Sequence, residues 1–118
     1  MRSFRSFAMV LCVVGSQAQA HAFLMKSDPA VGSAAAGKPP VLRLEFSEAI
    51  ELGFSGVELL GGSGSALPLN GVRFADDTHK VLLTGLPPLT PGAYHVKWHV
   101  VSVDTHRTEG EFAFTVKP

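Results

Sequence analysis

The sequence predicts an all-β fold, an antiparallel β-sandwich or small Greek-key barrel, preceded by a cleaved signal peptide. After residue 20, short runs in which apolar and polar residues alternate are separated by frequent Gly and Pro, as in half-buried strands joined by turns. No helix-period pattern of ordinary length occurs there. The 118 residues are enough for one domain, and no internal repeat is visible.

The N-terminus has the three parts of a secretory signal. Arg2 and Arg5 form a basic start, and residues 7–15 (FAMVLCVVG) are apolar but too short to span a bilayer as a helix. Ala18-Gln19-Ala20 fits the small-x-small cleavage pattern. We therefore expect a signal peptide over residues 1–20. An uncut membrane anchor is the alternative, which the short apolar run disfavours.

Cleavage after Ala20 would leave one domain over residues 21–118, with ten acidic residues and eight Lys or Arg, a formal charge of −2. A nucleic-acid interface needs a basic patch, and none is visible. The only cysteine, Cys12, lies in the signal, so the mature domain has neither a disulfide nor a thiolate ligand. Export without disulfides is compatible with a bacterial periplasm.

The first half of the domain contains three expected strands. Residues 21–26 (HAFLMK) open a strand that Ser27-Asp28-Pro29 ends, and residues 30–40 form a loop of small residues and prolines. Residues 41–46 (VLRLEF) alternate cleanly between an apolar and a charged face. Residues 56–60 (GVELL) form the next strand, followed by a flexible GGSGS turn.

Shorter strands follow. Residues 66–69 and 72–75 flank Asn70-Gly71, a dipeptide typical of hairpin turns. Residues 80–83 (KVLL) form another strand, which a proline-rich connection follows.

The strongest strand pattern covers residues 93–101 (AYHVKWHVV). Trp98 lies on its apolar face, and we expect its replacement by Ala to cost about 3–5 kcal/mol. His95 and His99 lie on the opposite, more solvated face, roughly 13 Å apart, so we interpret them as surface residues rather than joint metal ligands. Residues 111–116 (EFAFTV) form the closing strand.

The candidate chemistry lies between these last two strands. Asp104 and His106 are two residues apart, so in extended backbone they point to the same side with Cα atoms roughly 6.6 Å apart. One metal ion can touch both. The alternative is an ordinary turn with an exposed histidine. Asp77 and His79 have the same spacing, and we interpret them as a polar hairpin tip, because no third ligand is near in sequence.

His21 supplies the missing ligands, since cleavage would make it the first residue. A free α-amine has a reference pKa of about 7.7–8.0, so a metal can displace its proton near neutral pH. The amine and imidazole of His21, with Asp104 and His106, give three nitrogens and one oxygen. This donor set suits Cu(II), and zinc is not excluded. Met25 is the only methionine after the signal, so a thioether Cu(I) site is not supported.

These residues resemble CopC-type periplasmic copper-binding proteins of copper resistance. The resemblance lies in the mature start HAFLMKSDPAVGS, the middle LRLEFSEAIE and the ending LTPGAYHVKWHVVSVDTHRTEGEFAFTV, and it covers residues 21–118. It implies a seven-stranded Greek-key β-barrel of the cupredoxin-like or immunoglobulin-like kind. It also implies a copper(II) site built from His21, Asp104 and His106.

Two departures from the family pattern stand out. Residues 54–70 lack the Met and His with which some members bind Cu(I), so the chain resembles the Cu(II)-only branch. Arg107 stands where a proline often follows the motif histidine. The resemblance implies a protein that buffers copper or hands it to a CopD-type inner-membrane copper transporter. No transmembrane segment follows residue 118, so we expect that partner to be a separate chain.

Two alternative functions share features with this sequence. Histidine-brace copper oxygenases also chelate copper with an N-terminal histidine, but they use a second histidine in place of Asp-x-His and need a larger substrate surface. A β-sandwich for protein contacts, with incidental histidines, is the third possibility. No G-x-S-x-G, P-loop or dinucleotide motif is present. We therefore expect a binding protein rather than an enzyme.

Overall fold

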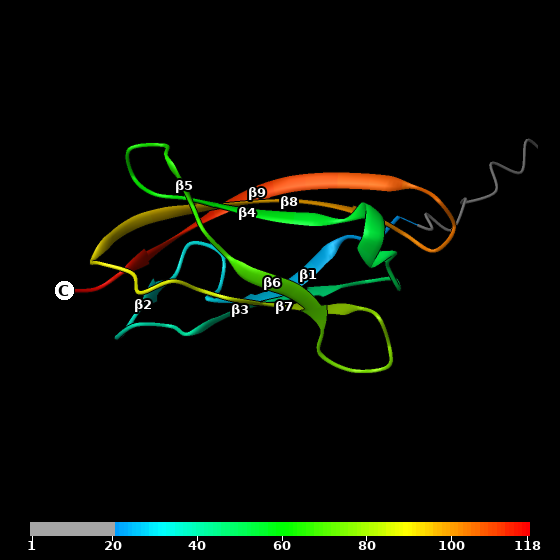
Figure 1. Cartoon of the computed structure of the whole chain (residues 1–118), viewed down its shortest axis with the longest axis horizontal. Coiled ribbons are helices and arrows are strands. Elements are labelled where there is room, and N and C mark those ends of the chain that lie inside the picture. The colour runs from blue at the N-terminus through cyan, green and yellow to red at the C-terminus, as the bar shows by residue number, and fades with distance from the viewer. Residues whose placement is uncertain (1–20) are drawn as a thin grey trace, which may run out of the picture.

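The computed structural model describes residues 21–118, so the expected signal peptide and Cys12 lie outside the described residues. Within this range the chain forms nine strands and one short 3-10 helix, η1 (Leu52–Phe54). The strands make two sheets that lie over one another (Figure 1). The predicted all-β fold class is confirmed. No helix in the described part is long and apolar enough to cross a membrane.

The two sheets differ in size. The four-stranded sheet has the order β1 (Leu24–Asp28), β3 (Val41–Phe46), β7 (Val81–Gly85) and β6 (Asn70–Phe74). The five-stranded sheet has the order β2 (Ala34–Ala35), β9 (Arg107–Val116), β8 (Gly92–Val101), β4 (Gly56–Leu60) and β5 (Ala66–Leu67). Neighbours are antiparallel except β2 and β9. Seven strands have five residues or more, the number that the family resemblance implies, and β2 and β5 have two each.

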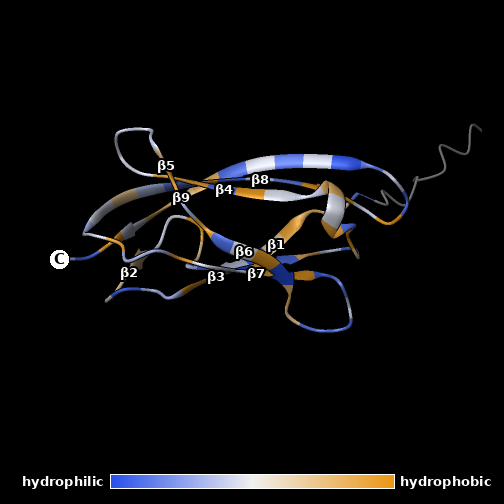
Figure 2. Ribbon diagram, in the orientation of Figure 1, coloured by the Kyte–Doolittle hydropathy of each residue, from blue (hydrophilic) through white to orange (hydrophobic). Residues whose placement is uncertain are grey.

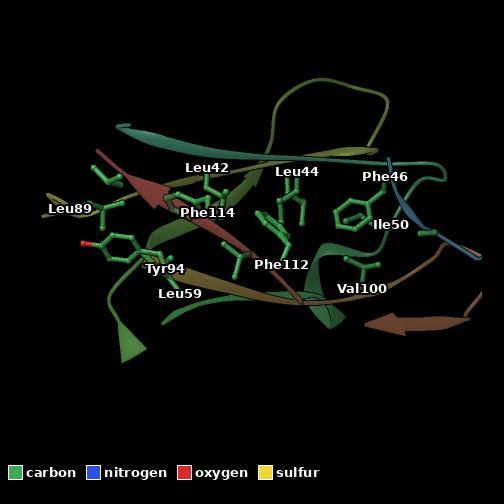
Figure 3. Packing of buried hydrophobic residues seen from close by; sticks show 14 residues of the cluster. Leu42, Leu44, Phe46, Ile50, Leu59, Leu89, Tyr94, Val100, Phe112 and Phe114 are labelled. Carbon is green, nitrogen blue, oxygen red and sulfur yellow. The ribbon is translucent and has the colours of Figure 1, made fainter. Parts of the chain in front are cut away.

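The core fills the space between the sheets. On β3 the side chains of Leu42, Leu44 and Phe46 are buried and those between them are half-exposed, as the alternation predicts. Figure 3 shows Leu42 and Leu44 facing Phe114 and Phe112 from the other sheet, and Phe46 lying across from Val100. On β9 the alternation is visible in Figure 2, where hydrophilic residues recur along its first half. Burial of the apolar faces therefore holds the two sheets together.

Trp98 lies at the margin of this core. Its ring meets Phe46 edge-on, with ring centroids 5.2 Å apart, a favourable aromatic geometry. Gly110 is its partner on β9, and a Cβ there would lie 2.7 Å from a carbon of the indole. The absence of a side chain at Gly110 therefore makes room for the indole. Trp98 packs against the core as predicted but is only partly buried.

Several sequence-based boundaries are wrong. β9 begins at Arg107, four residues before the expected start of the closing strand, because its pairing with β8 continues to Val101. β1 continues through Ser27 to Asp28, because pairing with β3 outweighs the local turn signal. The 30–40 segment contains β2, which a parallel pairing with β9 creates. Asn70-Gly71 is not a hairpin, since β5 and β6 belong to different sheets. Gly71 has φ +69° at a bulge that opens β6, so the dipeptide marks a crossing between the sheets.

Segments distant in sequence meet at one end of the sandwich, on the right of Figure 1. The backbone N–H of Ser47 donates to the carbonyl of Phe23 at 2.8 Å, and that of Ile50 donates to the carbonyl of His79 at 3.0 Å. Ile50 also pairs with Ser102 in an isolated bridge. This end therefore gathers the start of β1, the β6–β7 loop and the β8–β9 turn.

Candidate metal centre

His21 lies beside the β8–β9 turn because the residues after it are fixed from two sides. Ala22 is fully buried, and its carbonyl accepts a hydrogen bond from Thr108 Oγ1 at 2.6 Å. Ser47 Oγ donates to the carbonyl of His21 at 3.2 Å and accepts from the N–H of Phe23 at 2.8 Å. The backbone at His21 is thus held by residues from two other parts of the chain.

Asp104 and His106 lie in a turn rather than in extended backbone. Thr105 between them has φ +74°, in the left-handed region. Its N–H donates to the carbonyl of Ser102 at 2.8 Å, and the N–H of Ser102 donates to the carbonyl of His106, also at 2.8 Å. The turn places Asp104 Oδ2 3.3 Å from His106 Nδ1. The predicted Asp–His pair is therefore present, although turn geometry and not strand alternation creates it.

The structure also brings His21 to this pair. The imidazole rings of His21 and His106 meet edge to face, with centroids 4.7 Å apart and planes at 77°. The three predicted residues thus form a row in which His106 is central. Within residues 21–118, no three His, Cys, Asp or Glu side chains converge into a ready-made metal cage. Coordination of one ion by all three residues therefore requires their side chains to reorient.

One buried atom fits a metal. His21 Nδ1 is buried, and no hydrogen-bonding partner for it exists among the described residues. Leaving such a group unpaired costs about 1–3 kcal/mol, so buried polar atoms are nearly always satisfied. Here the ring that carries the unsatisfied nitrogen lies next to a second imidazole, that of His106, whose other neighbour is the Asp104 carboxylate. Nitrogen and oxygen donors of this kind suit Cu(II) or zinc.

The Asp104 carboxylate is kept ionised. The hydrogen bond from Ser102 is the largest influence on the pKa of Asp104, and together with the contact with His106 it outweighs the opposing effect of burial, so this pKa lies below the ordinary value of 3.8. A carboxylate with a depressed pKa keeps its negative charge in mild acid. Asp104 is therefore available as an anionic ligand wherever the imidazoles are neutral.

The second Asp-x-His does not reproduce this arrangement. His79, in the β6–β7 loop, has φ +59° and stacks on Phe74 with ring centroids 4.2 Å apart and planes within 5°. Asp77 is exposed and makes no ion pair with His79. Asp76 instead accepts a hydrogen bond from the N–H of Thr78 at 2.9 Å. The interpretation of this segment as a polar hairpin tip therefore agrees with the structure.

The remaining histidines lie on the outer face of the five-stranded sheet. His95 is exposed, and His99 is half-buried, with its ring against Gly56, where a Cβ would lie 2.5 Å from a ring carbon. An open groove of about 620 Å³ runs along this face. Its charged lining residues are Glu58, Lys97, Glu109 and Glu111. Neither histidine approaches the His21–His106 pair through any contact in the described part.

Sequence reasoning missed the hydroxyl groups that position the candidate ligands, on Ser47, Ser102 and Thr108. Serine and threonine are common in loops, so they carry little signal on their own. The available signal was the position of Ser102, two residues before Asp104, as His106 is two residues after it.

Comparison with known proteins decides the family. A family model described as the CopC domain matches residues 24–117. This chain belongs to the CopC domain family. Copper resistance protein C of Pseudomonas syringae pv. tomato is 38% identical over 111 residues, which cover 89% of this chain and 87% of that relative. The predicted family is therefore confirmed.

Two solved structures support the same conclusion. The crystal structure of CopC from Methylosinus trichosporium OB3b has a TM-score of 0.78 and 32% identity, covering 83% of this chain and 95% of that one. The crystal structure of PcoC, a methionine-rich copper resistance protein from Escherichia coli, has a TM-score of 0.71 and 36% identity, covering 82% and 99%. The CopC-like domain here has only Met25, so it is not methionine-rich.

Proposed function

We propose that this protein is a periplasmic copper(II)-binding protein of copper homeostasis and resistance, which buffers copper or hands it on. One observation carries the proposal: the unpaired, buried Nδ1 of His21 lies beside the His106–Asp104 pair. Membership of the CopC family and the names of copper resistance relatives favour copper over zinc. The nitrogen-rich donor set favours Cu(II), because Cu(I) prefers thioether and thiolate ligands.

In this proposal the metal site is completed by maturation. Cleavage between Ala20 and His21 would give His21 a free α-amine, and the amine and imidazole of one residue can chelate one ion. His106 would add a second imidazole and Asp104 a carboxylate oxygen. The metal would supply no reaction here, since it is the cargo. The chain's own residues hold it and release it.

The exchange partner implied by the family resemblance is a CopD-type inner-membrane copper transporter, and we propose that it is a separate chain. We favour binding over oxygenase chemistry because the third proposed ligand residue is a carboxylate. Asp104 stands where a histidine-brace enzyme has a further histidine.

The decisive experiment is a Cu(II) titration of protein that begins at His21, followed by electron paramagnetic resonance. We expect one tightly bound Cu(II) with a nitrogen-rich tetragonal spectrum. A matched control carries one extra glycine before His21, which leaves every side chain in place but removes the free amine from that residue. We expect the extension to weaken binding and change the spectrum. Equal binding by both proteins would refute the site.

A further inference from the structure

We propose that Ser102 is the positioning residue of this metal centre: its hydroxyl group joins Asp104 to His106 and fixes which oxygen of Asp104 faces the ion. This inference rests on the proposed function and deepens it. Ser102 does not itself contact the metal in this proposal. It acts through the two ligand residues that flank it in the turn.

The hydroxyl of Ser102 forms hydrogen bonds with both of those residues. Its hydrogen is donated to Asp104 Oδ1, with the carbonyl of His106 at 3.2 Å as a second acceptor, and its oxygen accepts the backbone N–H of His106 at 3.3 Å. A serine hydroxyl offers one hydrogen and two acceptor positions. One hydroxyl group therefore ties the carboxylate of one proposed ligand to the backbone of the other.

Ser102 can act as an anchor because it is itself fixed. It is 0% exposed, whereas residues 103–107 of the turn are exposed. The N–H of Ser102 donates to the carbonyl of His106, and its carbonyl accepts the N–H of Thr105. Ser102 also pairs with Ile50, which is 1% exposed. The exposed turn that contains Asp104 and His106 is therefore anchored at Ser102, which is part of the buried core.

The bond to Ser102 divides the Asp104 carboxylate into two different oxygens. Oδ1 is held by the serine, and Oδ2 faces His106 Nδ1 at 3.3 Å. A hydrogen bond to an ionised oxygen is stronger and more directional than one between neutral groups. Asp104 is thus oriented to offer Oδ2 alone to a cation, as one ligand of a four-coordinate site.

The chain contains a natural contrast to this arrangement. The tripeptide Asp-Thr-His recurs at residues 77–79, and there the position two residues before the aspartate is Ala75. Alanine has no hydroxyl, and Asp77 makes no ion pair with His79. The Asp–His pair therefore occurs in the copy that has the serine and not in the copy that lacks it.

The test compares Ser102→Ala with Ser55→Ala. Ser55 Oγ also makes two hydrogen bonds at this end, to the carbonyl of Glu51 at 2.8 Å and the N–H of Val101 at 3.2 Å, but it contacts no proposed ligand. Partners that orient metal ligands are worth about 10–100-fold in affinity. We expect Ser102→Ala to lose Cu(II) affinity by roughly this factor and to change the paramagnetic resonance spectrum. Ser55→Ala should change neither.

Metal-free protein gives an independent readout. Amide hydrogen exchange at His106 should accelerate in Ser102→Ala, because its N–H loses a buried acceptor, and Ser102→Thr should restore protection and affinity. Wild-type affinity and spectrum in Ser102→Ala would overturn the inference alone, whereas failure of the wild-type protein to bind Cu(II) overturns the proposed function as well. If Ser102→Ala does not fold, a crystal structure of the copper-loaded wild-type protein tests the role of Ser102 instead. Oδ1 should remain on Ser102, and coordination through both Asp104 oxygens would refute the inference.

Discussion

The tripeptide Asp-Thr-His occurs twice in this chain, at residues 77–79 and 104–106, and both copies lie at the same end of the sandwich (Figure 1). Ile50 lies between them, since its N–H bonds the carbonyl of His79 and it pairs with Ser102. Identical tripeptides therefore occupy neighbouring turns at one end of the fold. Only the second copy forms a candidate metal centre.

The copies differ in which residue has left-handed backbone. In the second copy it is the middle residue, Thr105, and the chain folds Asp104 and His106 toward one another. In the first copy it is the last residue, His79, whose ring stacks on Phe74 instead. The direction of the imidazole is therefore decided by the turn and by its neighbours, and not by the tripeptide.

The hydroxyl groups are also placed differently. Ser102 precedes the second copy and its hydroxyl donates to Asp104, while the hydroxyl of Thr78, inside the first copy, donates to Asp76. The carboxylate held in the first turn is thus Asp76, three residues before His79, whereas the one held in the second turn is Asp104, two residues before His106. Anchoring by a buried hydroxyl, rather than the Asp-x-His spacing, distinguishes the candidate site.

The largest expected effect comes from removing the histidine of each copy. His106→Ala should lower Cu(II) affinity by about 100-fold or more, since even outer partners of metal ligands are worth about 10–100-fold. His79→Ala should leave the affinity unchanged, because its ring packs on Phe74. Competition titration with a chelator measures both. Equal losses in the two variants would mean that the first copy also binds the ion.

The next effect is on the pH dependence of binding. Copper must displace protons from imidazole and α-amine nitrogens, whose reference pKa values are about 6.5 and 7.7–8.0, so affinity should fall as the pH drops from 7 to 5. The pKa of Asp104 lies below 3.8, so its carboxylate does not contribute to this loss. His106→Ala should flatten the profile and His79→Ala should not. A wild-type profile that is flat over this range would contradict the nitrogen ligands.

Sequence patterns predicted the fold well because strand alternation records which face is buried. On β3 and β8 the expected apolar faces lie in the core. What could not be predicted is set by long-range pairing. β2 exists only because β9 lies beside it, and β5 and β6 separate at Asn70-Gly71 because they join different sheets. No local pattern carries that information.

The ligand candidates were found for reasons that proved only partly correct. Strand alternation was expected to align Asp104 with His106, whereas a left-handed Thr105 does so. His21 was chosen for its position after Ala20, and the structure independently brings its ring to His106. The hydroxyls of Ser47 and Thr108 were missed because their partners are 24 to 86 positions away, whereas that of Ser102 was missed although its partners are local.

A smaller effect should distinguish the two threonines. Thr105 adopts φ +74°, a conformation that costs a residue with a Cβ about 1–2 kcal/mol. Glycine avoids this cost but loses about 0.5–1 kcal/mol more in backbone entropy on folding. Thr105→Gly also loses the exposed hydrogen bond from Thr105 Oγ1 to the carbonyl of Asp104 at 2.6 Å, which water can replace, so it should raise the free energy of unfolding by roughly 0.5 kcal/mol. Thr78→Gly should lower it by about 1 kcal/mol, since it loses the hydrogen bond from Thr78 Oγ1 to Asp76 and gains nothing from the backbone. Urea denaturation of metal-free protein tests both, and changes of the same sign would contradict the assigned turns.

The smallest effect concerns the two carboxylates that the hydroxyls hold. Hydrogen bonds from Thr78 lower the pKa of Asp76, as the bond from Ser102 lowers that of Asp104, both from 3.8. A carboxylate whose pKa is lower in the folded state stabilises that state at pH values above its unfolded-state pKa. This stabilisation is lost as the pH falls through its folded-state pKa. Both contributions should thus be constant above about pH 5 and disappear in stronger acid. Thr78→Val should raise the pKa of Asp76 toward 3.8 in an NMR titration and leave Cu(II) binding intact, whereas loss of copper affinity in that variant would show that the two turns are coupled through Ile50.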